Sequence, residues 1–454
     1  MLFYEFMSNA AQVLPELQNL ESSPRVLPRA EMVTLYGCVG LLLFAPLAFG
    51  TVEPWSIFIL EAGSAGLLIT WLMGRMNADA IPLRQNALLG PFLAFAGLVV
   101  LQLFTGLSSY RYMTWTSALL FASYAILCFL LSQVLRRAED LTRLGLGATA
   151  YGFLLAMFAV VQDLSNDAKT GKIYWLRLPR SGGWIYGPYV NHNHYAGLME
   201  MLFPIPLAIC LSRRVERGPK IALAAASMFM ASTIVLSGSR GGILALAAQT
   251  AVVAGFMTFK RKSPRVALVL GGIVAVTAVW IFWVGGSGLA DRMATFHSEA
   301  HTELSSGLRM TVTRDCWRMI KERPILGFGL GTFPTAYPPF QSFFTNGFVN
   351  EAHNDYAQLL VEMGLLGGLV LVWFLFLLFQ AAWNKLRSGK LGVNGGAALA
   401  GILGCIGILV HSFFDFNLQV PSNAAWFYAL AVLVVAPAVS EPRFRSSGSR
   451  GVRL

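Results

Sequence analysis

The chain has 454 residues, of which 56% are hydrophobic and only 13% are charged. A soluble protein averages about 25% charged residues, so this composition excludes most soluble enzymes. Lysine and arginine outnumber the acidic residues by 34 to 23, giving a formal net charge of +11. We expect no nucleic-acid binding, because no basic stripe interleaved with aromatic residues occurs on a polar segment.

Apolar runs long enough to cross a bilayer, roughly 20 residues each, occur about twelve times along the chain. The sequence therefore predicts an all-α, polytopic membrane bundle with about twelve transmembrane helices. The predicted spans are residues 33–50, 55–74, 87–104, 114–135, 144–161, 195–211, 221–236, 241–259, 266–285, 357–380, 397–411 and 424–438.

Most of the lysines and arginines lie in short connections on one side of these spans, and the positive-inside rule makes that side cytoplasmic. Both termini are then cytoplasmic. The first 32 residues have no signal-peptide core or cleavage site, so the first span is predicted to be an uncleaved anchor. The long connections 162–194 and 286–356 face outward, and the second follows the ninth span. All six histidines lie in outer segments or at an outer span end, which places the expected function on the outer face.

Residues 187–197 (GPYVNHNHYAG) lead directly into a span. A helix N-terminus at the membrane surface suits an anionic ligand such as a phosphate, although Asn191 or Asn193 is equally suited to be an ordinary N-cap. His192 and His194 have the spacing of metal ligands, but no third ligand lies at a recognisable distance, so we predict no metal site. The five cysteines predict neither a disulfide framework nor a CxxC metal site.

Residues 237–242 (SGSRGG) separate two apolar spans with almost no loop. An arginine so close to hydrocarbon is costly, which makes Arg240 a candidate functional residue, with snorkelling to the headgroups as the alternative. The neighbouring glycines allow a ligand to approach the backbone closely. We do not expect Ser239 to be a nucleophile, because nothing nearby in the sequence supplies its base.

Residues 308–322 are predicted to be helical and to stop before Pro324. At 100° per residue, Arg309 falls on the apolar face and requires a structural carboxylate or a bound anion as its partner. Arg314, Arg318 and Lys321 fall on the opposite face.

His353 lies in the sequence AHNDY immediately before a span. It is a candidate general base, with a structural histidine as the alternative. Glu61, Glu200 and Glu362 lie within predicted spans, where they would form a proton or ion relay or would pair with inward arginines.

Four segments taken in order resemble the O-antigen ligase and polymerase family of bacterial membrane glycosyltransferases. They are residues 187–197, residues 237–242, residues 324–331 (PILGFGLG), and AHNDY at 352–356 followed by EMGLLG at 362–367. The resemblance covers about residues 187–370. It implies a GT-C-like enzyme of the bacterial inner membrane that uses a polyprenyl-diphosphate-linked glycan at the periplasmic face.

The resemblance also implies roles for individual residues. Arg240 and Arg309 would bind the diphosphate of an undecaprenyl-diphosphate donor, and His353 would act on the acceptor hydroxyl with inversion at the anomeric carbon. No metal or other cofactor is implied. Candidates for weaker donor or acceptor contacts are Asn191, Asn193, His194, Tyr195 and Asn354, and Trp184, Tyr186, Tyr189 and Tyr195 are candidates for stacking on sugars.

The expected division of the chain follows from these assignments. A cytoplasmic segment (1–32) precedes the first transmembrane helices and first periplasmic loop (33–186). The ligase-like catalytic region (187–370) includes the periplasmic segment 286–356. The last helices (371–438) and a basic cytoplasmic tail (439–454) complete the chain.

The expected activity is transfer of the glycan to lipid A-core. The alternatives are a glycan polymerase or a transferase to protein side chains and, from another class, a proton-coupled transporter or lipid flippase using the three span glutamates. Polymerases of the family carry an Arg-x10-Gly pattern that Arg318 and Gly329 match. We interpret this match as coincidence, because Arg318 falls on the outward face of its helix. The lack of an inverted repeat disfavours transport.

Overall fold

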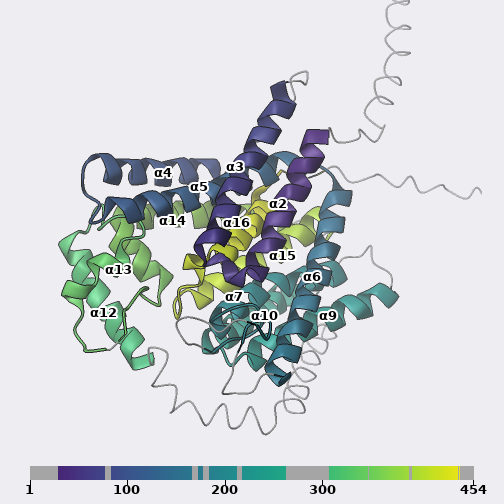
Figure 1. Ribbon diagram of the computed structural model, residues 1–454. Helices are drawn as coiled ribbons and strands as arrows, with labels where there is room; N and C mark the ends of the chain where they lie inside the picture. The colour runs from purple at the N-terminus through teal and green to yellow at the C-terminus, as the bar shows by residue number, and fades with distance from the viewer. Residues whose placement is uncertain are drawn as a thin grey trace, which may run out of the picture.

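Helices form all the extended regular structure in the part of the chain that the computed structural model describes, residues 29–76, 83–165, 172–176, 184–211, 217–261, 306–345, 347–387, 391–437 and 439 (Figure 1). The predicted all-α class is therefore confirmed for these residues. The α-helices are α2 (Arg29–Leu47), α3 (Pro54–Met76), α4 (Leu89–Phe104), α5 (Arg111–Val134), α6 (Ala138–Ser165), α7 (His192–Leu202), α8 (Pro204–Leu211), α9 (Arg217–Leu236), α10 (Arg240–Arg261), α12 (Ser306–Glu322), α13 (Phe333–Ala336), α14 (Asp355–Leu386), α15 (Val393–His411) and α16 (Pro421–Val435). Short 3-10 helices cover Phe49–Thr51, Pro338–Phe340 and Asn417–Gln419.

Nine helical spans in the described residues are long and apolar enough to cross a membrane, with α7 and α8 counted together as one span. The chain is thus a multi-pass membrane protein, as predicted. Helices α4 and α16 are apolar but shorter, with 16 and 15 residues, or about 24 and 22 Å at 1.5 Å per residue. The predicted span 266–285 lies outside the described residues, as do most of the two terminal segments. The total of about twelve spans therefore remains a prediction.

Helices α7 and α15 are the most deeply buried of the long apolar helices in the described residues. Helix α15 packs against α7, α8, α10, α14 and α16. Small residues permit this close approach: a Cβ added at Gly401 would lie 2.7 Å from the carbonyl oxygen of Leu430. The start of α7 and the end of α15 meet at one end of the bundle, where the ring of His194 lies against that of Phe416.

The segment between α12 and α13, residues 324–333, is here called the glycine strap. It crosses α14 at Gly364, where that helix is interrupted by a φ of 62° that a residue with a side chain rarely adopts. The backbone N–H of Gly329 donates to the carbonyl oxygen of Glu362 at 2.9 Å, and Leu365 donates back to Pro324 at 2.8 Å. The repeated glycines of this motif are therefore explained by close backbone contact between the strap and α14.

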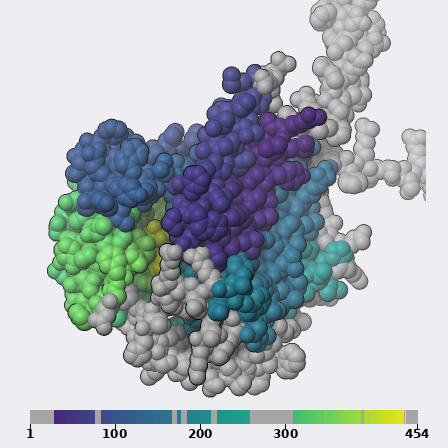
Figure 2. Space-filling view, viewed as in Figure 1, coloured from purple at the N-terminus to yellow at the C-terminus, as the bar shows by residue number. Residues whose placement is uncertain are grey.

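The carboxylate of Glu362 also fastens the strap. It is buried and accepts the backbone N–H of Gly331 at 2.8 Å and that of Phe333 at 3.2 Å. Gly331 has a φ of 70°, and a Cβ there would collide with the hydroxyl of Ser117 in α5. The strap thus ties the segment of α12 and α13 to both α14 and the α4–α5 pair. Helices α4, α5 and α14 lie side by side in Figure 1, and Figure 2 shows the green surface of the α12–α13 segment against the blue surface of the α4–α5 pair.

We expect Glu362→Ala to lower the thermal midpoint of the purified protein. The change would leave two buried backbone donors without their acceptor, at a cost of about 1–3 kcal/mol for each unsatisfied group. Glu61→Gln in α3 is the matched control, because Glu61 is only partly buried. Equal midpoints for Glu362→Ala and the wild type would contradict this role of the Glu362 carboxylate.

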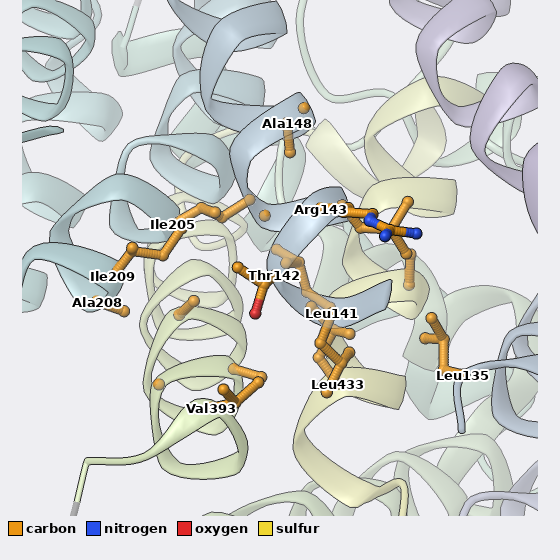
Figure 3. Close-up of a pocket in the computed structure, with 18 of the residues that line it drawn as sticks. Leu135, Leu141, Thr142, Arg143, Ala148, Ile205, Ala208, Ile209, Val393 and Leu433 are labelled. Carbon is orange, nitrogen blue, oxygen red and sulfur yellow. The ribbon is translucent and has the colours of Figure 1, made fainter. Parts of the chain in front are cut away.

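A cavity of about 580 Å³ lies between α2, α6, α8, α15 and α16 (Figure 3). Its walls are mainly aliphatic and include Leu135, Ile205, Val393 and Leu433. The cavity adjoins the Val393 end of α15, whereas the polar side chains described next gather beyond the His411 end. It is therefore not the candidate site.

Candidate functional site

Asp415 lies in the turn that follows α15 and joins residues from two other segments. Its Oδ1 is 3.2 Å from Nδ1 of His353, and its Oδ2 is 3.5 Å from Nη1 of Arg309. The same Arg309 nitrogen donates to the carbonyl oxygen of Phe414 at 3.2 Å. The side chain of Asp415 is 1% exposed, against 20% for Arg309 and 13% for His353. The buried carboxylate is therefore bracketed by two side chains that solvent reaches in part.

The charge state of Asp415 follows from these neighbours. Burial alone would raise the pKa of Asp415, but Arg309 and His353, with a contribution from His194, hold that pKa well below its ordinary value of 3.8. The ionised carboxylate favours a proton on Nδ1 of His353, because only an N–H can donate to it. In the neutral imidazole, Nε2 is then left as a proton acceptor.

The stability that Asp415 contributes should depend on pH in a defined direction. A carboxylate whose pKa is lower in the folded than in the unfolded state stabilises the fold at pH values above its unfolded pKa. This stabilisation is lost as the pH falls through its folded pKa. We therefore expect Asp415→Asn to lower the thermal midpoint clearly at about pH 7 and by less at about pH 3. A midpoint difference that stays constant over this range would contradict the ionised pair.

The backbone before α14 orients His353. Asn354 is the N-cap of α14, and its Oδ1 accepts the N–H of Ala357 at 3.0 Å. His353 has a φ of 52°, a left-handed conformation that costs a residue with a side chain about 1–3 kcal/mol and is found most often at functional sites. Its ring meets that of Phe416 edge to face at 4.8 Å. Asn354 thus contributes through the cap it forms.

Helix α12 carries Arg309 into the cluster with the phase predicted from the sequence. Val312, Cys316 and Met319 are fully buried on the same face. Arg314, Arg318 and Lys321 are exposed, as predicted. Arg318 donates to the carbonyl oxygen of Phe340 at 3.3 Å, so it points away from the cluster. Of the two partners left open for Arg309, the structure supplies a carboxylate.

Arg240 is the first residue of α10 and is exposed. Ser239 precedes it, and the Oγ of Ser239 accepts the N–H of Gly242 at 3.1 Å. A Cβ added at Gly241 would lie 2.6 Å from Nε2 of His411. The start of α10 therefore packs against the end of α15, and both candidate arginines border the same turn, residues 411–415.

The residues around the start of α7 divide into two groups. His194 faces the cluster, since its ring lies 4.7 Å from that of Phe416. Asn191 is the N-cap of α7 and accepts the N–H of Asn193 at 2.7 Å. Tyr195 is fully buried, with its hydroxyl 2.9 Å from that of Thr233. The structure therefore brings His194 to the site, whereas Asn191 shapes the helix end and Tyr195 faces the interior.

Sugar stacking by the three candidate tyrosines does not agree with their burial. Tyr186 and Tyr189 are each 1% exposed, and Tyr195 is 0% exposed, so these rings present no face to a glycan. Trp184 is half-buried and stacks on His192. The three tyrosines are therefore not placed to stack on sugars. The sequence could not predict the burial of these rings, because an aromatic residue in a loop can either cover a helix end or be exposed to solvent.

Two of the three span glutamates, Glu362 and Glu200, are held by specific contacts. Glu362 fastens the glycine strap, and Oε1 of Glu200 lies 2.7 Å from Nδ1 of His411. The partners of these two acids are a histidine and backbone N–H groups rather than the arginines considered from the sequence. No group of three or more histidine, cysteine or acidic side chains in the described residues has the arrangement of a metal site.

Asp415, Phe416 and His411 were not singled out from the sequence. They lie in or beside the tract HSFFDFN, residues 411–417, which has no distinctive spacing. Only the inward orientation of Arg309, which required either a carboxylate or a bound anion as its partner, pointed toward such a residue. The sequence offered no way to choose Asp415 among the other carboxylates.

A multi-pass helical membrane protein with a polar cluster at one end of its bundle is the class that the fold and site define. Residues 225–372 match the sequence model of the O-antigen ligase family, Wzy_C. This part of the chain is similar to the O-antigen ligase family, which confirms the resemblance seen in its motifs. The match covers about a third of the chain and includes Arg240, Arg309 and His353. No curated protein matches the chain. The similarity associates the chain with glycan transfer of the ligase or polymerase type.

Proposed function

We propose that this protein transfers a glycan from undecaprenyl diphosphate to an acceptor hydroxyl on lipid A-core, at the periplasmic face of the bacterial inner membrane. The observation that carries the proposal is the cluster in which one buried carboxylate, that of Asp415, contacts both Arg309 and His353. It combines a permanent cation with an oriented imidazole. Those are the two groups that a metal-independent transfer from a diphosphate requires.

In the proposed reaction, the acceptor oxygen attacks the anomeric carbon of the glycan in a single displacement. The bond from that carbon to the diphosphate oxygen breaks, and its electron pair leaves with the diphosphate. Nε2 of His353 takes the proton of the acceptor hydroxyl, and Asp415 stabilises the imidazolium that forms. Arg309 and Arg240 donate to the diphosphate oxygens, where negative charge develops. The configuration at the anomeric carbon is inverted.

A second observation supports a lipid-linked donor. A mainly apolar cavity of about 210 Å³ lies between α4, α5, α14 and α16. Phe92, Phe121 and Phe374 line its apolar part, and Asp355, two residues after His353, also lines it. A cavity with apolar walls close to the polar cluster suits a substrate with a hydrocarbon tail and a charged head. We assign this cavity to the first isoprene units of the donor.

The proposal is tested by deleting the gene in the source bacterium and analysing surface lipopolysaccharide together with the lipid-linked glycan pool. Ligation predicts uncapped core and an accumulation of long lipid-linked polymer. Core capped by single repeats, with short lipid-linked units accumulating, would replace the ligase with a polymerase. An unchanged profile would refute both and would direct the same assay to protein or exopolysaccharide acceptors.

A further inference from the structure

Three buried side chains form a connected polar chain beneath the candidate site. Oε1 of Glu200 in α7 lies 2.7 Å from Nδ1 of His411 at the end of α15, and Nε2 of His411 lies 3.4 Å from Oγ of Ser239. Each of the three residues is at most 1% exposed. These residues are far apart in the sequence, so the contact joins three separate helices at one point.

The hydrogen-bond directions along this chain are mutually consistent. A carboxylate beside Nδ1 favours a proton on that nitrogen, which leaves Nε2 of the neutral ring as an acceptor. The hydroxyl of Ser239 can then donate to Nε2 while its oxygen accepts the N–H of Gly242 at 3.1 Å. The hydroxyl of Ser239 thus both donates and accepts a hydrogen bond while it caps α10. Together with its complete burial, this arrangement excludes Ser239 from contact with substrate.

The first turn of α10 sits directly on this chain. A Cβ added at Gly242 would lie 3.2 Å from Oε1 of Glu200, and one at Gly241 would lie 2.6 Å from Nε2 of His411. On its other side, the carbonyl oxygen of His411 accepts the N–H of Phe414 at 2.8 Å and that of Asp415 at 3.2 Å. The same histidine therefore contacts the helix that begins with Arg240 and the turn that presents Asp415.

We propose that Glu200, His411 and Ser239 are positioning residues, which hold the first turn of α10 so that Arg240 faces the diphosphate-binding side of the site. The inference rests on the proposed function, in which Arg240 binds the donor's diphosphate. None of the three residues touches substrate. Replacing any of them is expected to weaken diphosphate binding only because Arg240 is displaced. A general contribution to folding would not depend on Arg240 in this way.

The test is a double-mutant cycle read by the Kd of undecaprenyl diphosphate for the purified full-length protein in lipid nanodiscs. Ser239→Ala should weaken binding about fivefold, the effect of losing one helix cap, and Ser239→Thr should restore most of it. In an Arg240→Ala background, Ser239→Ala should change the Kd by less than about twofold, because the group being positioned is gone.

Ser227→Ala is the matched control, since it also removes a buried serine hydroxyl, bonded to the carbonyl oxygen of Phe203 at 3.0 Å, and should leave the Kd unchanged. If Ser239→Ala weakened binding equally in the wild-type and Arg240→Ala proteins, the positioning role would be refuted, while the proposed function would remain intact. An Arg240→Ala variant that binds like the wild type would instead refute the diphosphate role itself. Should Ser239→Ala not yield folded protein, the nearly isosteric Ser239→Cys replaces it in the same cycle, with the same outcomes.

Discussion

Replacement of His353 by alanine is expected to reduce the rate of glycan transfer by about 10²–10⁴-fold, the usual contribution of a positioned general base. Nε2 of this imidazole is the proposed acceptor of the hydroxyl proton, and Asp415 holds the ring by Nδ1 at 3.2 Å. The rate should be measured with purified protein in nanodiscs, an undecaprenyl-diphosphate-linked glycan and lipid A-core. The Kd for undecaprenyl diphosphate should change little.

A second variant separates the imidazole from the backbone that carries it. His353 has a left-handed φ of 52°, which glycine adopts without strain. His353→Gly should therefore fold well, lose transfer to the same extent and recover part of it when imidazole is added to the assay. Transfer by His353→Ala within about fivefold of the wild type would show that His353 is not the base.

Arg309→Ala is expected to reduce transfer by about 100-fold or more, because it removes a charge-assisted contact to the diphosphate and the cation beside Asp415. It should also lower the thermal midpoint, since a buried carboxylate loses one of its two partners. Arg309→Lys keeps the charge but loses the planar, two-pronged donor, so it should restore stability better than activity. Donor Kd, transfer rate and midpoint are measured for each variant.

Arg314→Ala provides the control for Arg309. Both arginines lie in α12, but Arg314 is exposed. Arg314→Ala is expected to leave the transfer rate within about twofold of the wild type and the thermal midpoint nearly unchanged, as most surface substitutions do. If Arg314→Ala abolished transfer and Arg309→Ala did not, the proposed contact between Arg309 and the diphosphate would be refuted. This conclusion would not depend on the result for His353.

The sequence predicted the features that depend on neighbouring residues. The orientation of α12 follows from a period of 100° per residue, so Arg309 was correctly placed inward and Arg318 outward. Most span positions follow from runs of apolar residues, and the structure has helices at every predicted span that its described residues cover. The single predicted span 195–211 forms two helices, because Pro204 and Pro206 interrupt backbone hydrogen bonding near its centre.

The sequence could not predict the contacts that close the site. Asp415 meets His353 and Arg309 only after α14 and α15 have packed, and Glu200 meets His411 only where α7 packs against α15. The contact between Ser239 and His411 could not be predicted either, because the two residues are far apart in the sequence. Glu200 and Glu362 looked like parts of an ion relay for a related reason, since the groups that bind their carboxylates are a distant histidine and the backbone of the glycine strap.

The aliphatic cavity at the Val393 end of α15 has a consequence for inhibition. Along α15, this cavity is lined from Val393 to Ala400, so its nearest edge lies about 16 Å from His411 at 1.5 Å per residue. A compound that fills it cannot touch His353 or the arginines and would not compete with donor or acceptor. Its influence would have to pass through the packed helices, α15 among them, to Asp415, so compounds selected for this cavity would be allosteric ligands.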